Sequence, residues 1–194
     1  MVIGITGPTG SGKTTLLNLI AEQGGTILDC DAIYHQLLAT DKALLWAIEA
    51  RFPGTVENGQ LQRKKLGAIV FSDAAALADL NAITHAAVKQ AVLQELSKNP
   101  PLAAIDAIGL FEGGLAELCH TTVAVVAPRE DRIARIMARD NIGYDYAASR
   151  VDAQHDPAWF AEKCDYTLEN SSTMAAFQDQ CLAFLHRIGI IKSE

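Results

Sequence analysis

The chain has 194 residues, a hydrophobic fraction of 49% and a net charge of −7 at pH 7. This length suits one folded domain with a sizeable apolar core. The acidic balance excludes general electrostatic attraction to nucleic acid or to an anionic membrane, so we expect neither as a partner. A binding site for a polyanion must therefore gather its positive charge locally.

Signals for export or membrane insertion are not found in the sequence. No apolar run is long enough to span a bilayer, and the first six residues lead into a glycine-rich loop rather than a signal peptide. The four cysteines lie at positions 30, 119, 164 and 181 without C-x-x-C spacing. Buried thiols in a reducing compartment are favoured over disulfides or a metal site, so we expect a cytoplasmic protein.

Residues 7–15 read G-x-x-x-x-G-K-T, the pattern of a phosphate-binding loop. The preceding segment Val2–Thr6 is apolar and β-branched, which predicts a buried strand. The following residues 16–21 have the composition of a helix. The loop therefore stands between a strand and a helix, as phosphate binding requires.

The residue types of this loop explain its expected chemistry. Glycines allow successive backbone N–H groups to turn inward as an anion nest, and the next helix adds its N-terminal N–H groups and the positive end of its dipole. We expect Lys13 to reach the β- and γ-phosphates, Thr14 to bind Mg²⁺ and Thr15 to lie near the α-phosphate. The expected nucleotide-binding loop residues are Gly10, Ser11, Gly12, Lys13, Thr14 and Thr15.

Two aspartates follow a second short strand at 26–28. Asp29 and Asp31 precede an expected helix at 32–38, and they stand at the edge where α/β sheets bind ligands. One carboxylate could serve a reacting hydroxyl group and the other Mg²⁺ or its waters. The alternative is that Asp31 only caps the helix.

Helices are expected at 41–52 and 72–98, separated by an Asn-Gly turn at 58–59. The basic cluster 63–65 is either a solvated helix face or a contact for the phosphates of a second substrate. His85, within the long helix, has a structural and a catalytic interpretation of equal weight.

Further strands are expected at 102–108 and 121–127, with a loop at 110–114 on the ligand edge. Asp106 lies in the first of these strands. An acid on a core strand beside the phosphate loop can hold Mg²⁺ through water.

The segment 129–140 predicts a helix with Arg132, Arg135 and Arg139 on one face, because they recur at i, i+3 and i+7. A turn and a second helix at 144–154 complete a helix–turn–helix lid. The arginines are either a surface stripe paired with nearby acids or groups that close over ATP; the second interpretation is favoured. A turn at 156–157, a strand at 165–168 and a helix at 173–188 complete the chain.

These elements predict a doubly wound α/β fold. We expect a three-layer sandwich with a mostly parallel sheet of about five strands. The whole chain, 1–194, would form one P-loop kinase domain. A helical region at about 41–98 would cover the acceptor, and a lid at about 132–154 would cover ATP.

Stretches along nearly the whole chain now coincide with one family pattern. The chain resembles the dephospho-coenzyme A kinases, which are P-loop kinases. The resemblance rests on Gly4-Ile5-Thr6-Gly7 through Gly10-Ser11-Gly12-Lys13-Thr14, Asp29-Cys30-Asp31, Gly59-Gln60-Leu61-Gln62-Arg63, Leu80-Asn81-Ala82-Ile83-Thr84-His85, Asp106, Leu110-Phe111-Glu112, Arg135, Arg139-Asp140, Arg150, Gln154, Cys164-Asp165 and Asn170.

The resemblance implies transfer of the γ-phosphoryl group of ATP to the ribose 3′-hydroxyl group of dephospho-coenzyme A. It places Asp31 near that hydroxyl group, and Lys13, Mg²⁺ and lid arginines including Arg139 would neutralise the developing charge. It also places Arg63, His85 and Glu112 on the acceptor side and Asn170 near the nucleotide base. The implied partners are small molecules, with the protein a monomer or weak homo-oligomer.

The chain departs from the family pattern at three places. His35 stands where the family usually has arginine, Ala86 follows the histidine in place of proline, and Ile108 begins a segment that usually starts with proline. Histidine cannot replace the permanent, bidentate charge of arginine. Two alternatives therefore stay open: another small-molecule or nucleoside kinase, and an ATP-binding regulator with impaired catalysis.

Overall fold

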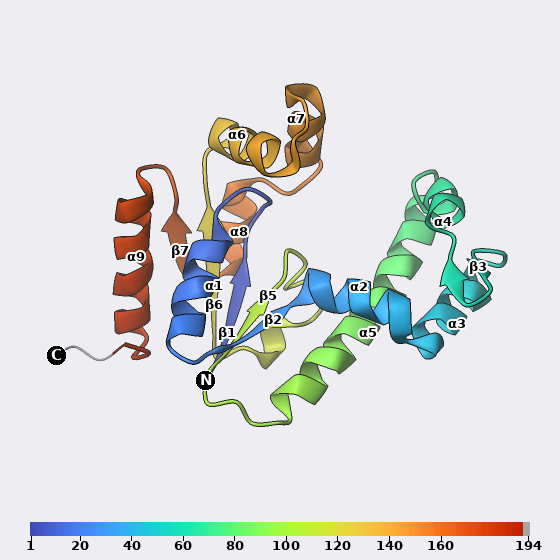
Figure 1. Ribbon diagram of the computed structural model, residues 1–194, viewed down its shortest axis with the longest axis horizontal. Coiled ribbons are helices and arrows are strands. Elements are labelled where there is room, and N and C mark those ends of the chain that lie inside the picture. Colours follow the sequence, from blue (N-terminus) through green and yellow to red (C-terminus); the bar gives the residue numbers. More distant parts are fainter. Residues whose placement is uncertain (192–194) are drawn as a thin grey trace. The chain divides into compact units, whose positions relative to one another are not determined.

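A computed structural model describes residues 1–191, which divide into two compact units (Figure 1). The first unit comprises Met1–Leu28, Pro100–Leu110 and the chain from Ala116 onward. The second comprises Asp29–Asn99 and Phe111–Leu115. The first unit contains the phosphate loop and the arginine-rich helix, and the second contains the aspartate pair and the basic cluster.

A five-stranded sheet of order β2-β5-β1-β6-β7 organises the first unit. Strand β1 pairs in parallel with both β5 and β6, and β6 pairs in parallel with β7. The expected mostly parallel five-stranded sheet is thus confirmed. The strands are β1 (Val2–Thr6), β2 (Thr26–Asp29), β5 (Ala103–Asp106), β6 (Thr121–Val126) and β7 (Tyr166–Glu169).

Alternating residues of β6 face two different layers. Val123 and Val125 belong to a core cluster with helices α1 (Lys13–Glu22) and α9 (Met174–Arg187). Ala124 and Val126 pack in a separate cluster with Phe160 of α8 (Pro157–Lys163). Because successive side chains of a strand point to opposite faces, helices cover both faces of the sheet. The expected three-layer α/β sandwich is confirmed.

The prediction of a turn at Asp156–Pro157 is wrong, because a helix starts there. The Asp156 carboxylate accepts a hydrogen bond from the backbone N–H of Trp159 at 2.8 Å, and Pro157 occupies the first helical position. Both features favour the start of a helix.

Helices α6 (Arg129–Asp140) and α7 (Tyr144–Asp152) pack against each other after β6 (Figure 1). Asn141 ends α6 in the left-handed conformation, with φ of 53°. The pair has its own apolar core. That core consists of Ile133, Ile136, Ala147, Ala148 and Val151. A short 3-10 helix, Ala116–Leu118, precedes β6.

The second unit is mainly helical. Its elements are α2 (Cys30–Thr40), α3 (Lys42–Arg51), β3 (Val56–Glu57), β4 (Gln60–Leu61), α4 (Arg63–Val70) and α5 (Ala74–Leu96). Asn58 and Gly59 adopt φ values of 52° and 74°, and this turn joins β3 and β4 into a short antiparallel hairpin. Phe52 and Ile48 are fully enclosed in a core between α2, α3, α4 and α5.

The four cysteines are present as thiols. Burial raises the pKa of Cys119 to about 12 and the pKa of Cys181 to about 11, so neither is a thiolate near neutral pH. Within residues 1–191, no helix is both long enough and apolar enough to cross a membrane.

Candidate active site

The phosphate loop joins β1 to the first turn of α1. Gly12, the N-cap residue of α1, has φ of 100° and offers no side-chain cap. The N-terminal N–H groups of α1 are therefore not capped by that residue, and such groups attract anions. Lys13 Nζ donates a hydrogen bond to the Gly7 carbonyl at 3.1 Å. It also lies 4.0 Å from Asp106 Oδ1, because β5 and β1 pair with Asp106 opposite Ile5.

Neighbouring groups approach the loop so closely at Gly10 and Gly12 that both positions require glycine. A Cβ atom at Gly10 would lie 2.8 Å from the carbonyl oxygen of Arg132, and one at Gly12 would lie 2.3 Å from Asn170 Nδ2. Both glycines also have positive φ values, 78° and 100°. Side chains would be strained there and would displace the elements packed on the loop.

Two arginines of α6 hold the loop by its carbonyl groups. Arg132 Nε donates to the Thr9 carbonyl at 2.9 Å. Arg135 Nη1 donates to the carbonyls of Gly10 and Ser11 at 3.2 and 3.3 Å. In a trans peptide the C=O and the following N–H point in opposite directions. The arginines therefore direct the N–H groups of residues 10 and 12 away from α6.

Arg132 and Arg135 donate to carbonyl groups of the phosphate loop. Neither a surface stripe paired with nearby acids nor a set of groups that closes over ATP predicts these partners. Arg132 is only 2% exposed, and burial lowers its pKa, so it is not part of a surface stripe. Arg135 also donates through Nη2 to the Asn170 carbonyl at 3.2 Å. Two of the three arginines thus position the phosphate loop.

Asn170 and Gln154 contribute two more contacts to the loop. Asn170 is buried, and its Nδ2 donates to the Ser11 carbonyl at 2.9 Å. Gln154 Oε1 accepts from the Thr9 backbone N–H at 2.8 Å and from Arg132 Nη2 at 3.3 Å. Gln154 is among the residues that resemble the family pattern. Its contact with the loop is not predictable from spacing, because a position just beyond a helix does not show whether a side chain is buried or where it points.

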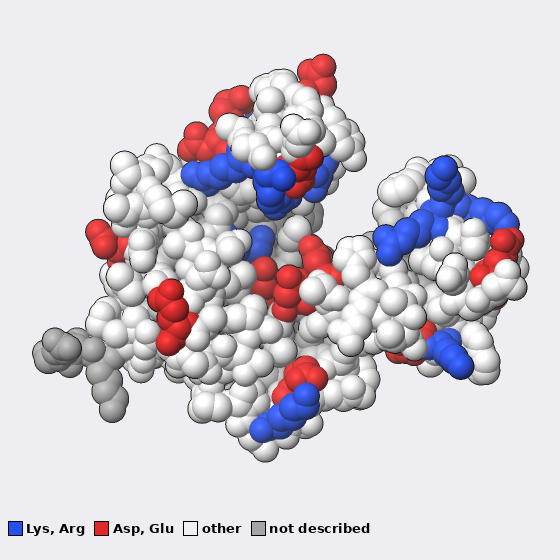
Figure 2. Space-filling view, viewed as in Figure 1, with Lys and Arg blue, Asp and Glu red and all other residues white. Residues whose placement is uncertain are grey.

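The third arginine of the face, Arg139, has a different partner. Its Nε and Nη2 donate to Asp140 Oδ1 and Oδ2 at 2.7 and 3.0 Å, and Arg150 Nη1 donates to Oδ2 at 2.5 Å. The guanidinium groups of Arg139 and Arg150 hold the pKa of Asp140 well below its usual range. Figure 2 shows basic and acidic side chains together over α6 and α7, and residues 129–152 carry five Arg and five Asp or Glu, so the helix pair has no net charge.

The donors near Lys13 suit a magnesium ion that arrives with a nucleotide. Thr14 is exposed in the first turn of α1, and Asp106 ends β5 beside Lys13. Mg²⁺ is usually bound by one or two protein oxygens together with phosphate oxygens and waters. Residues 1–191 contain no group of three or more His, Cys, Asp or Glu that could hold a metal ion.

The other expected site residues belong to the second unit. Asp31 is exposed in the first turn of α2. The N-cap of that helix is Asp29, whose Oδ1 accepts from the Ala32 N–H at 3.0 Å. The alternative that Asp31 merely caps the helix is therefore wrong.

The acceptor-side residues lie on several elements of the second unit. Arg63 begins α4 and lines, with His35 of α2, a cavity of about 320 Å³ beside the β3–β4 hairpin. His85 is half-buried within α5, which packs against α2. Glu112 lies in the short segment Phe111–Leu115. The structure thus brings His35 and Arg63 to one cavity.

The parallel sheet, the phosphate loop before α1 and the arginine-bearing helix pair define a P-loop kinase of the α/β class. Comparison with known proteins makes this assignment specific. The family model CoaE, described as dephospho-CoA kinase, matches residues 1–176. The chain therefore belongs to the dephospho-CoA kinase family.

Individual relatives agree with this family. A dephospho-CoA kinase of Latilactobacillus sakei is 31% identical over 191 residues, covering 96% of this chain and 95% of the relative. The crystal structure of TT1252 from Thermus thermophilus is similar with a TM-score of 0.82 at 32% identity, covering 97% of each chain. A structure of dephospho-CoA kinase from Campylobacter jejuni is similar with a TM-score of 0.66 at 25% identity, covering 96% of each chain.

Proposed function

We propose that this protein transfers the γ-phosphoryl group of ATP to the ribose 3′-hydroxyl group of dephospho-coenzyme A and so produces coenzyme A. One observation carries the proposal. A phosphate loop held in shape by Arg132, Arg135 and Asn170 occurs in a chain that matches the dephospho-CoA kinase family over residues 1–176. The loop supports ATP as the donor, and the family supports the acceptor.

The first unit would bind and activate the nucleotide. Loop amides at Gly10–Thr15 would surround the phosphates, with Lys13 neutralising charge at the transferred group. Thr14 and Asp106 would hold Mg²⁺, which supplies further neutralisation when bound. Asn170 would lie near the base, and Arg139 would stabilise charge on the phosphoryl group.

The second unit would present the acceptor. Asp31 would orient the reacting hydroxyl group and accept its proton, because an acid in this role is part of the general kinase mechanism. Arg63 would bind acceptor phosphates, with His85 and Glu112 as further acceptor contacts. The protein would act in the cytoplasm on small molecules, as a monomer or weak homo-oligomer, without nucleic acid or membrane.

A coupled ADP-release assay tests the proposal with dephospho-coenzyme A, adenosine and shikimate as acceptors. We expect turnover with dephospho-coenzyme A alone, dependent on added Mg²⁺ and abolished by a chelator. Phosphorylation of another acceptor would instead support a different small-molecule kinase. ATP binding by calorimetry without transfer to any acceptor would support the regulator that His35 leaves open.

Two substitutions assign the roles within that reaction. Asp31→Asn is expected to reduce kcat by at least about 100-fold while ATP affinity stays nearly unchanged. Lys13→Ala is expected to weaken ATP binding as well as turnover, because it removes the charge nearest the phosphates. Unchanged turnover in Asp31→Asn would remove Asp31 from this role without affecting the assignment of the phosphate loop.

A further inference from the structure

Asp140, the last residue of α6, lies between two guanidinium groups. It accepts two hydrogen bonds from Arg139 of the same helix and one from Arg150 of α7. These residues lie on either side of the turn 141–143 that joins the two helices. A single carboxylate thus bridges two cations from different helices.

Helix stability does not explain an aspartate at this position. The C-terminal end of a helix carries partial negative charge, so an acid there is unfavourable. The first turn of α6 has the favourable arrangement, with Glu130 and Asp131 near the positive end of the dipole. The two arginines offset this cost at Asp140, and they also keep its carboxyl group ionised.

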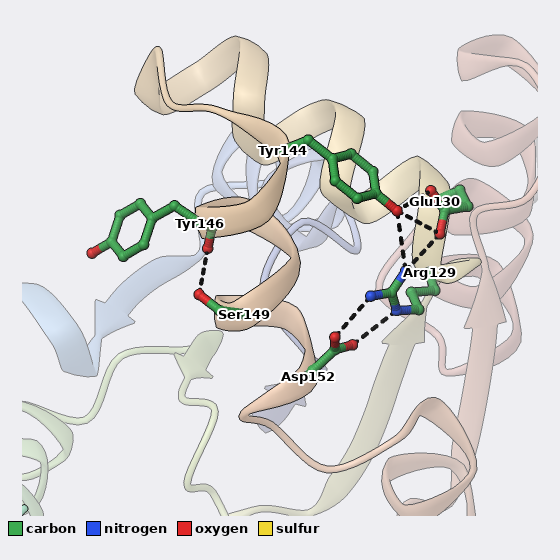
Figure 3. Close-up of polar contacts among 6 residues, drawn as sticks. All are labelled: Arg129, Glu130, Tyr144, Tyr146, Ser149 and Asp152. Atoms are coloured by element: carbon green, nitrogen blue, oxygen red, sulfur yellow. Dashed lines mark hydrogen bonds and ion pairs between the residues drawn. The ribbon is translucent and has the colours of Figure 1, made fainter.

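Cohesion of the helix pair does not depend on Asp140 either. The five apolar residues of the α6–α7 core are all 8% exposed or less. At the start of α6, Arg129 forms a bidentate ion pair with Asp152, the last residue of α7, with distances of 2.8 and 2.7 Å. Figure 3 shows this contact together with Tyr144 and Glu130, which also contact Arg129. The helices are therefore joined independently of the turn.

The contacts of Asp140 leave donors on both arginines for another anion. Arg139 uses its Nε edge and Arg150 uses only Nη1, and their side chains are 58% and 37% exposed. Two guanidinium groups this close repel each other unless an anion lies between them. With Asp140 in place, the cluster keeps a net charge of +1 and several N–H groups that face solvent.

We propose that Asp140 is a positioning residue for phosphoryl transfer, which holds Arg139 and Arg150 side by side so that both can donate to the transferred group. The inference rests on the proposed function, because it gives Arg139 a partner in that reaction. During transfer, charge spreads over three equatorial oxygens of the phosphoryl group. Donors at a fixed separation stabilise that charge better than donors that move apart.

Paired substitutions in the full-length protein test this role. Asp140→Asn and Asp152→Asn each replace one ionised carboxylate that joins α6 to α7, but only the first contacts Arg139 and Arg150. We expect Asp140→Asn to lower kcat about tenfold or more with KM for ATP within about twofold, since displaced catalytic groups reduce turnover strongly. Asp152→Asn should keep kcat within about twofold.

A second variant and two controls keep the test decisive. Asp140→Glu retains the charge and should recover at least part of the lost kcat, whereas a purely structural role predicts no such rescue at equal Tm. Calorimetric ATP binding and Tm establish that each variant is folded. Equal losses of kcat in Asp140→Asn and Asp152→Asn, in step with Tm, would overturn the proposal.

The test also separates this inference from the proposed function. An active wild type whose kcat is unchanged by Asp140→Asn overturns the positioning role alone. A wild type that binds ATP but does not phosphorylate dephospho-coenzyme A overturns the proposed function, and the positioning role with it.

Discussion

The arginines of the α6–α7 pair fall into two groups, a buried end next to the phosphate loop and an exposed end around Asp140. Near the start of α6, Arg132 and Arg135 donate to backbone carbonyls of the phosphate loop. In the last turns of α6 and α7, Arg139 and Arg150 are exposed and share one carboxylate. Burial and partner, rather than residue type or helix face, therefore separate the loop-positioning arginines from those that remain available to a substrate.

The largest expected effect is at the exposed end. Arg139→Ala should lower kcat on the order of 10³-fold, because arginines that neutralise transition-state charge contribute that much in phosphoryl transfer. Its Tm should change little, since exposed ion pairs add little stability. Steady-state kinetics and thermal unfolding provide the measurements. Arg187→Ala, an exposed arginine of α9 that stacks on Tyr166, is the control and should keep wild-type kcat; equal kcat in both variants would contradict the comparison.

The next effect is at the buried end and concerns stability and ATP affinity. Arg132→Met leaves the Thr9 carbonyl and Gln154 Oε1 without this donor, so we expect a loss of about 2–3 kcal/mol in unfolding free energy. ATP affinity should fall as well, because the loop amides lose their fixed direction. Urea unfolding and calorimetry measure both. Arg129→Met, an exposed arginine on the same helix, should affect both far less; a similar loss there would show that burial is not the deciding difference.

Asn170 gives a smaller and more local test of the buried end. Asn170→Ala removes the donor to the Ser11 carbonyl, and we expect a loss of about 1–2 kcal/mol in unfolding free energy. Asn170→Asp should be worse, because a carboxylate would face that carbonyl and could not donate. If the aspartate variant were the more stable of the two, the hydrogen bond would not be what fixes this side of the loop.

The smallest effect is the response to acid. Asp140 and Asp152 have lowered pKa values because of Arg139, Arg150 and Arg129. Their contribution to stability is therefore present above the unfolded value of roughly 3.9 and is lost as pH falls through the folded pKa. Urea unfolding between pH 6 and 3 should show a smaller decrease for an Asp140→Asn/Asp152→Asn double variant than for wild type. The carbonyl partners of the buried arginines do not titrate, so they add nothing to this pH dependence. Identical pH profiles of the unfolding free energy would therefore show that the two ion pairs do not contribute to stability.

Much of the fold could be predicted from the sequence because strand and helix periods alternate clearly. The local pattern alone correctly predicts the position of the phosphate loop and the bounds of α6. The turn predicted at Asp156–Pro157 leaves out helix α8, because a capping acid followed by proline is typical of a helix start as well as of a turn. The sequence predicts no bounds for helix α4 beyond the possible helix face at 63–65, because the segment contains an internal glycine at position 67 and a basic cluster.

The site was only partly predictable for a physical reason. The spacing of Arg132, Arg135 and Arg139 correctly indicates one helix face, but that face extends from the phosphate loop to solvent. Which arginine is buried depends on how closely the loop approaches α6, and that distance comes from the tertiary packing of Gly10. The proximity of Asp106 to Lys13, in contrast, follows from the pairing of β5 with β1. An acid on a core strand therefore predicts a carboxylate beside the phosphate loop.

The contacts on the phosphate loop also affect the thermodynamics of nucleotide binding. Donors from Arg132, Arg135 and Asn170 restrain three successive carbonyls of the loop, at positions 9, 10 and 11, through groups of the protein itself. The conformational entropy of this segment is therefore lost when the chain folds, and little of it remains to be lost when ATP arrives. Such preorganisation makes affinity depend on the triphosphate–amide contacts themselves rather than on ordering of the backbone.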